Sequence, residues 1–399
     1  MRDTEQCLED GCPGRQTTYE AIRSPTGETL IMKESPEWTG DSCSTTRDAK
    51  WVTEQGFEDF NYATVPLSEG MIRLLSIKAA TFTSDVVECE MVIMPLDEAK
   101  EFNALSYTWG KPVFDAQILC NGHRLAITSS LERTLMVYLR SLGVFNERPL
   151  WVDAVCIDQS NIPERNAQIL LMQRIYASAT TVMVDLGEAD HTWALGFDVM
   201  IKCSRAHHLS DGYRPQEQSS YDAIFSSLPP PDHLAWTYYM NIYSSPWFRR
   251  TWILQVAFAK TAQVRYGRFI FPWRTFAEAF TFFTKSRWDR YLAQRAASIL
   301  VHLGRLSVTS ILEIRDLSKQ TEETISLVSV LRISRNQEVT DPRDKVIGIL
   351  GIIPNGATEK AISYIADYAL PLSSMYHRLA VHLVRIGAAI HMLPYAGVH

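Results

Sequence analysis

The sequence predicts an α/β fold around a parallel sheet, and residues 150–187 provide the main evidence. Two apolar runs, LWVDAVCI and TTVMVDLG, have the length of buried strands, and an amphipathic segment with helix-start signals separates them. A strand, a helix and a second strand at this spacing are typical of a parallel pair joined by a right-handed crossover.

The helix inside this unit is expected to start after Asn161. The Asn161 side chain can cap it, Pro163 falls in its first turn, and Glu164 follows the cap by three residues. One face repeats larger apolar residues at helical spacing and ends in an alanine: Ile169, Met172, Tyr176 and Ala179.

The elements before this unit are expected to be strands and one helix. The segments IRLLSIKA and VVECEMVIMPL alternate like the two strands of a half-buried hairpin, which predicts an N-terminal β-hairpin region. FNALSYTWG is typical of a short apolar strand that ends at Gly110, and Asn121-Gly122 in QILCNGHRLAI is a strong hairpin-turn signal. Residues 131–142 indicate a helix.

Composition divides the chain into a short arm and one large domain. Residues 1–65 are polar and lack periodicity, so they predict a partly disordered arm, which four aromatic residues could attach to the body: Trp38, Trp51, Phe57 and Phe60. Residues 66–399 predict a single domain, in which 188–235 form a lid-like insertion and 275–399 are mainly helical. The sequence DPRDK at 341–345 indicates a helix start with its own ion pairs.

Charge and cysteine content exclude several classes of function. Acidic side chains outnumber basic ones by 45 to 39 and the net charge is −6, so nucleic acid is not expected as a partner. The seven cysteines include no CxxC pair and no histidines at zinc-ligand spacing, which indicates a reduced compartment and no metal site. Because no signal peptide or membrane span is evident, the chain is expected to be cytoplasmic, with the nucleus as the alternative.

No familiar catalytic or cofactor motif stands out. Ser106 lacks the GxSxG elbow, and neither His207 nor His208 has a recognisable partner in the sequence. There is no GxGxxG that opens a helix and no phosphate loop, so no cofactor is expected. The sequence therefore identifies no catalytic residue.

Carboxylates within the apolar runs need a partner or a function, because an unpaired buried charge is strongly destabilising. Asp153 is expected in the middle of its strand, as a buried structural acid paired with Arg165 or Arg250. Asp185 is expected to be a second structural acid. Asp158 either caps the next helix or contacts a ligand, and the sequence leaves both alternatives open.

Three short stretches are candidates for a binding site. In a doubly wound sheet, ligands bind beyond the carboxyl ends of the strands, near the topological switch point. Two of the stretches are expected at such strand ends, and they carry Tyr107 with Trp109 and Asp158 with Gln159. The segment SSPWFRRTWILQ adds Trp247, Arg250, Trp252 and Gln255. An arginine between two tryptophans can stack on their rings or hold an anionic ligand, but packing and architecture are the alternative for every one of these residues.

Four sequence blocks resemble, in the same order, those of the fungal heterokaryon-incompatibility (HET) domain family: FNALSYTWG, LWVDAVCIDQSNIPERNAQILLMQRIYASATTVMVDLG, SPWFRRTWILQVAFAK and DPRDKVIGILGI. The core blocks fall within residues 71–351. The resemblance implies an open, flavodoxin-like, mainly parallel sheet related to Toll/interleukin-receptor domains, with extra helices, and a fungal source. It also implies a role in the programmed cell death that follows fusion of incompatible strains.

One position departs from the family pattern. The third block of the family usually continues with Gln and Glu, whereas here Gln255 is followed by Val256. If the missing acid serves nucleotide cleavage, as in related Toll-like NAD hydrolases, this chain lacks the group that would stabilise the developing positive charge. The departure argues against NAD hydrolase activity.

Two functions therefore compete. The first is a stand-alone, cofactor-independent enzyme of fungal secondary metabolism, which folds an apolar terpenoid or polyene in an aromatic pocket for Diels–Alder-type ring closure. The alternative is a cell-death signalling domain without NADase activity. The lost acid and the isolated domain favour the enzyme slightly. An apolar small molecule is then the expected partner, and a homo-oligomer stays open.

Overall fold

The structure is a computed structural model that describes residues 22–23, 29–30, 56–78, 86–140, 148–189, 193–211, 226–230, 232–286, 299–319, 326–353 and 364–392. Two aromatic residues of the N-terminal arm, Trp38 and Trp51, lie outside these ranges, as does His191. Phe60 packs against the main core, and Phe57 packs against a small cluster of Val86 and Leu119.

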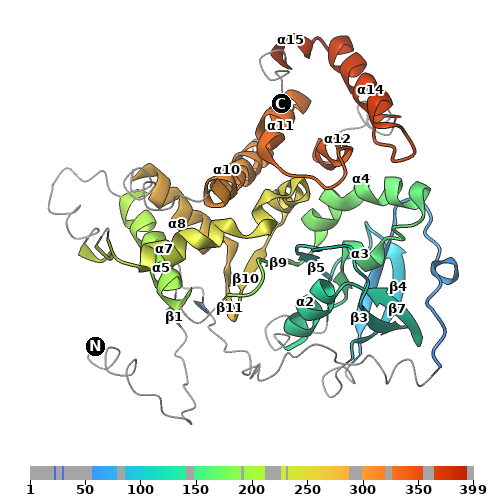
Figure 1. Ribbon diagram of the computed structural model, residues 1–399, viewed down its shortest axis with the longest axis horizontal. Coiled ribbons are helices and arrows are strands. Elements are labelled where there is room, and N and C mark those ends of the chain that lie inside the picture. The colour runs from blue at the N-terminus through green and yellow to red at the C-terminus, as the bar shows by residue number, and fades with distance from the viewer. Residues whose placement is uncertain are drawn as a thin grey trace.

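A nine-stranded sheet lies at the centre of the chain, in the order β11-β10-β9-β5-β8-β3-β4-β6-β7 (Figure 1). Its strands are β3 (Met71–Ile77), β4 (Glu88–Pro95), β5 (Asn103–Ser106), β6 (Ala116–Cys120), β7 (His123–Ile127), β8 (Leu150–Trp151), β9 (Thr181–Asp185), β10 (Ala262–Tyr266) and β11 (Phe269–Pro272). A separate antiparallel pair consists of β1 (Ile22–Arg23) and β2 (Thr29–Leu30).

The sheet is mixed, which corrects the prediction of a mainly parallel sheet. Strands β10, β9, β5 and β8 are parallel neighbours, and β4 is parallel to β6. Antiparallel pairs join β11 to β10, β3 to both β8 and β4, and β7 to β6. The α/β class is confirmed, and so are both predicted hairpins. Asn121 and Gly122 have φ angles of 53° and 77°, the left-handed conformation that a tight hairpin turn requires.

The predicted strand LWVDAVCI is wrong in its second half. β8 ends at Trp151, and the chain then turns into the short helix α3 (Asp153–Cys156), where the Cys156 amide donates to the Val152 carbonyl at 2.7 Å. At the first position of α3, the Asp153 carboxylate accepts the Ala154 amide at 2.8 Å. Within a continuous strand the Ala154 amide would not be available to this carboxylate, because the amides of a strand bond to the neighbouring strands.

The following helix meets its prediction. α4 (Ile162–Ser178) is capped by Asn161, whose side chain accepts the Glu164 amide at 3.2 Å. The predicted apolar face is buried: Ile169, Met172, Tyr176 and Ala179. α4 connects β8 to β9, both of which pair with β5 in parallel, as the strand–helix–strand pattern predicted.

The remaining helices are α2 (Ser129–Arg140), α5 (Trp193–Asp211), α7 (Ala235–Asn241), α8 (Trp273–Lys285), α10 (Ile299–Lys319), α11 (Leu327–Ile333), α12 (Asp344–Leu350), α14 (Leu372–Arg385) and α15 (Ala389–Met392). Short 3-10 helices are η1 (Tyr62–Thr64), η3 (Ile242–Ser244), η4 (Pro246–Arg249), η5 (Thr251–Phe258) and η6 (Ser334–Asn336). Within the described ranges, no helix has the length and apolar character needed to cross a membrane.

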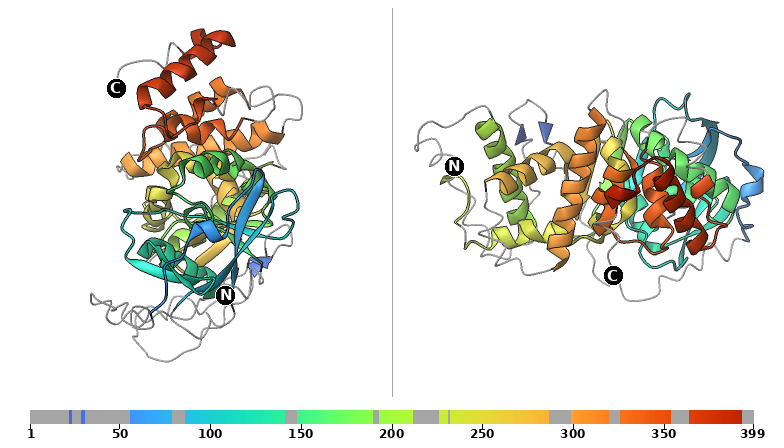
Figure 2. Two further views of the ribbon diagram at one scale, coloured as in Figure 1. Left: turned by 90° about the vertical axis from the view of Figure 1, so that its right-hand side faces the viewer. Right: turned by 90° about the horizontal axis from the view of Figure 1, so that it is seen from above.

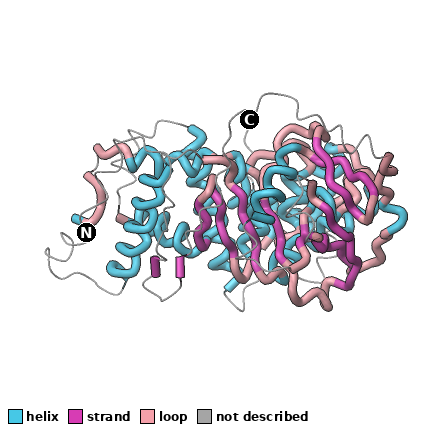
Figure 3. The backbone as a smooth tube through the Cα atoms, turned by 90° about the horizontal axis from the view of Figure 1, so that it is seen from below, coloured by secondary structure: helices cyan, strands magenta, loops and turns pink. Residues whose placement is uncertain are grey.

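The helices form two groups around the sheet. α5, α7 and α8 lie together at one end, and the strands extend from there toward the other end (Figures 1 and 3). α4 lies along one side of the sheet, and the C-terminal helices α11 to α15 lie beyond it (Figures 1 and 2). α5, from the predicted insertion, is joined to this body because Trp193 stacks on Phe271 of β11, with centroids 6.2 Å apart.

Candidate functional site

Residues 245–250 cross the carboxyl ends of the adjacent parallel strands β5 and β9. Ser245 Oγ donates to the Leu186 carbonyl, just after β9, at 2.8 Å. Trp247 Nε1 donates to Ser106 Oγ, at the end of β5, at 3.0 Å. The crossing thus holds the SSPW segment at the edge where ligand binding was predicted, with Trp247 itself fully buried.

Asp153 is the carboxylate at this edge, immediately after β8. Its two oxygens lie 3.1 and 3.0 Å from Nε1 of Trp109, and its backbone carbonyl accepts Nε2 of Gln159 at 2.8 Å. Arg250 donates to the Tyr107 carbonyl at 2.8 Å. Tyr107, Trp109, Asp153, Gln159 and Arg250 are named here the sheet-edge site. Tyr107 is buried, whereas the other four are half-buried.

Burial dominates the electrostatics of the sheet-edge site. Desolvation raises the pKa of Asp153, and the Arg250 charge and the Trp109 hydrogen bond oppose this shift. Burial likewise raises the pKa of Tyr107. The site therefore combines a carboxyl group that resists ionisation with a nearby guanidinium group. Such a pair can bind a polar ligand or move a proton.

The predicted arginine partners of Asp153 are placed differently. Arg250 acts on Asp153 by its charge, but it donates a hydrogen bond to the Tyr107 carbonyl. Arg165 points to the C-terminal region, where its guanidinium lies 3.7 Å from the centroid of the Tyr368 ring. Arg165 was an unsuitable candidate because its first-turn position on α4 faces the C-terminal segment.

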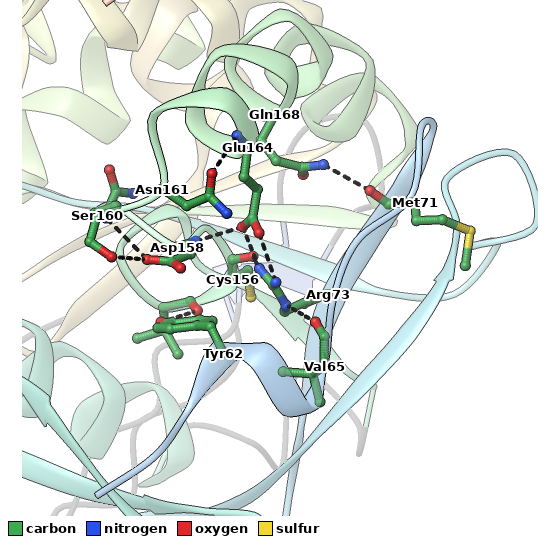
Figure 4. A network of polar contacts seen from close by, with 12 residues as sticks. Tyr62, Val65, Met71, Arg73, Cys156, Asp158, Ser160, Asn161, Glu164 and Gln168 are labelled. Carbon is green, nitrogen blue, oxygen red and sulfur yellow. Dashed lines mark hydrogen bonds and ion pairs between the residues drawn. The ribbon is translucent and has the colours of Figure 1, made fainter.

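Asp158 and Gln159 occupy the loop between α3 and α4. Asp158 Oδ1 accepts the Ser160 amide at 3.0 Å and the Ser160 hydroxyl at 2.6 Å, and its own amide donates to Glu164 at 2.7 Å. These contacts close the loop locally, whereas the cap of α4 is Asn161 and not Asp158 (Figure 4). Gln159 instead reaches back to Asp153.

A buried ion pair holds this loop, and the sequence reasoning missed it. Arg73 of β3 donates NH1 and NH2 to the two oxygens of Glu164, at 2.5 and 2.9 Å (Figure 4). Arg73 also donates Nε to the Val65 carbonyl at 2.8 Å and NH1 to the Cys156 carbonyl at 3.2 Å. Arg73 is completely buried. The sequence contains one indication of this ion pair, a charged residue within the apolar strand IRLLSI.

Trp252 and Gln255 belong to a different part of the molecule from the sheet-edge site. Trp252 Nε1 lies 3.4 Å from Oδ2 of Asp344, and Gln255 Nε2 donates to the Gly348 carbonyl at 3.2 Å. Both contacts go to α12. Val256 is 2% exposed and packs in the apolar core. A carboxylate at this position would need its own buried partner.

Other charged groups serve contacts between elements. Asp185, at the end of β9, pairs with Arg265 of β10 at 2.8 Å, and both are buried. His208, which had no recognisable partner in the sequence, lies 2.9 Å from Glu278 of α8. Asp341 pairs with Arg343 at 2.6 Å just before α12, which confirms the helix start and ion pair predicted for DPRDK.

The described residues include no group of three or more His, Cys, Asp or Glu side chains that could hold a metal ion. Four cysteines lie in the described ranges, and each is buried and free of disulfides: Cys89, Cys120, Cys156 and Cys203. Burial raises the pKa of Cys156 to about 12, which makes its thiolate a minor species at neutral pH.

The fold and the site define an α/β domain with a mixed sheet, whose carboxyl edge carries a half-buried acid beside an arginine. Residues 102–255 match the family described as Heterokaryon incompatibility protein (HET). The resemblance to the HET family seen in the sequence blocks is thus confirmed over these residues.

A curated relative extends this comparison. The chain is 29% identical over 226 residues to Heterokaryon incompatibility protein 6, OR allele, of Neurospora crassa. The match covers 49% of this chain and 33% of the relative, so the chain spans about a third of the length of that protein. No solved structure gives a significant match.

Proposed function

We propose that this chain acts as a heterokaryon-incompatibility domain that signals cell death, with the sheet-edge site as its functional centre. The observation that carries the proposal is one of position. The family match over residues 102–255 includes every residue of the sheet-edge site, from Tyr107 to Arg250. The relative's name supplies the biological process, heterokaryon incompatibility.

The strand order supports a flavodoxin-like core for this domain. Counted along the chain, the parallel strands are β5, β8, β9 and β10, and their order across the sheet is second, first, third, fourth. In flavodoxin-like sheets of this order, the switch point lies between the first and third strands. Here these are β5 and β9, and residues 245–250 cross their carboxyl ends.

The chemistry available at the site is that of one acid and one arginine. Gln159 anchors the backbone of Asp153, and Trp109 orients its carboxylate. Arg250 is held by the Tyr107 carbonyl close enough to influence the charge of Asp153. A polar or anionic ligand fits this arrangement better than an apolar one. A hydrocarbon would remove water from the carboxyl and guanidinium groups without replacing the lost hydrogen bonds.

The placement of the aromatic residues gives no support to the ring-closing enzyme. Trp247 lies in the core, and the indole N–H groups of Trp109 and Trp252 contact the carboxylates of Asp153 and Asp344 in different places. A shared dry pocket would require these three side chains and that of Tyr107 to face one cavity. The cell-death alternative therefore comes first.

The test is controlled expression of the chain in a filamentous fungus. We expect induced wild-type chain to arrest growth and kill cells, and Asp153→Asn to restore growth at equal protein level. Asp97→Asn is the matched control, because Asp97 is an exposed carboxylate in a surface pair with Arg174, and it should remain toxic. Harmless wild-type expression, or an equally toxic Asp153→Asn chain, would contradict the proposal.

A further inference from the structure

The C-terminal helices expose a row of large apolar side chains. α14 buries one side, with Met375, Leu379 and Leu383. Five exposed apolar residues lie on α14, in the turn after it and at the start of α15, and are named here the apolar ridge: Leu372 (41% exposed), Tyr376 (42%), Val384 (66%), Ile386 (52%) and Ile390 (68%). Leu372 and Tyr376 are neighbours at the start of α14, whereas Val384 lies in its last turn.

The ridge ends in a projecting tip. Val384, Ile386 and Ile390 are the most exposed of its members and surround the turn between α14 and α15. Gly387, with φ of 70°, turns the chain there. α14 and α15 lie at the top of the molecule, on the side of α4 away from the sheet, in Figure 1 and in the left view of Figure 2. The tip is therefore convex and accessible.

The charge around the ridge is positive. α14 contains Arg378 and Arg385, the histidines 377 and 382, and no acid. The acid nearest along the chain within residues 364–392 is Asp367, which already accepts Asn166 Nδ2 at 2.8 Å. A basic end on a chain with a net charge of −6 favours an anionic partner.

We propose that the apolar ridge docks the chain on the surface of an anionic lipid bilayer. Apolar helix faces bordered by basic residues lie in the bilayer interface and insert their side chains into the headgroup boundary. A convex tip with three aliphatic side chains suits a soft lipid surface, which needs no complementary groove. A second copy would bring the same basic residues to the contact, and like charges disfavour it.

The test is co-sedimentation of the full chain with lipid vesicles. Wild-type chain should pellet with vesicles of phosphatidylcholine plus phosphatidylserine, pellet little with phosphatidylcholine alone, and be released in part by added salt. The triple variant Val384→Ser/Ile386→Ser/Ile390→Ser should lower the bound fraction by about tenfold or more, because the buried apolar area is lost. All three side chains are more than half exposed, and an unchanged thermal melt would verify the fold.

A matched control is available at another exposed apolar site. Val113→Ser/Phe114→Ser removes side chains that are 54% and 63% exposed in the loop before β6, and it should bind vesicles like the wild type. Failure of the wild type to pellet, or equal pelleting by the triple variant, would overturn the proposal. So would a dimer in light scattering that the triple variant abolishes without any vesicle binding, since the ridge would then hold a second copy.

Discussion

Glu164 and Asp153 are two of the acids that lie beside arginines, and their surroundings differ in a way that separates an architectural contact from the proposed functional site. Glu164 is gripped by Arg73 through two short hydrogen bonds, and it also accepts the Asp158 amide. Asp153 instead accepts hydrogen bonds from the Trp109 indole and the Ala154 amide, and the charge of Arg250 opposes the rise in its pKa. The first acid joins two elements of the fold, whereas the second is the acid of the proposed functional site.

The largest effect is expected from breaking the Arg73–Glu164 pair. Arg73→Met should lower the free energy of unfolding by about 3–5 kcal/mol, because it leaves the Glu164 carboxylate poorly paired in a buried place. Urea denaturation of the purified chain measures this change. Arg174→Ala is the control, since Arg174 and Asp97 form an exposed pair, and its effect should stay within about 1 kcal/mol. If both variants lost a similar free energy of unfolding, burial of Arg73 would add nothing to the stability of the chain.

The next effect concerns the two tryptophan–aspartate contacts. Trp109→Phe removes the N–H that orients Asp153 and should lower the free energy of unfolding by about 1–3 kcal/mol. It should also abolish toxicity in the fungal assay at equal protein level. Trp252→Phe, which removes the longer contact to Asp344, is the matched control and should leave toxicity intact. If both variants lose toxicity to the same degree, the sheet-edge site has no special role.

The smallest effect is a pH dependence. Burial raises the pKa of Asp153, so the folded chain binds this proton more tightly than the unfolded chain. The stabilising contribution is present below the ordinary pKa of 3.8 and is lost as pH rises through the folded pKa. Relative to Asp153→Asn, the wild type should therefore lose stability toward neutral pH. Urea unfolding at stepped pH checks this, and parallel curves for the two chains would contradict it.

Local signals sufficed for much of the fold. The Asn121-Gly122 turn, the Asn161 cap and the apolar face of α4 depend on neighbouring residues, and all three occur as predicted. Strand direction across the sheet depends on contacts distant in sequence. The antiparallel pairing of β3 with β8, through Leu75 and Leu150, has no local signal in the sequence, and it joins the predicted hairpin to the parallel strands.

The site was predictable only in part. The sequence placed Tyr107, Trp109 and Arg250 among the candidates, and the structure brings them to one edge. It also grouped Trp252 and Gln255 with them, because they belong to the same segment, SSPWFRRTWILQ. The chain instead forms the 3-10 helix η5 after Arg250, which turns these two side chains toward α12. Arg73 was missed because its partner Glu164 lies 91 residues away.

The brevity of β8 has a mechanical consequence. Among the residues that the structure describes, Leu150 and Trp151 alone link β5 to β3 within the sheet, so a seam divides the sheet there. Arg73 and Glu164 fasten β3 to α4 across this seam. Under a pulling force, or in amide exchange, the sheet should open first along β8, and the Arg73–Glu164 ion pair should delay this separation.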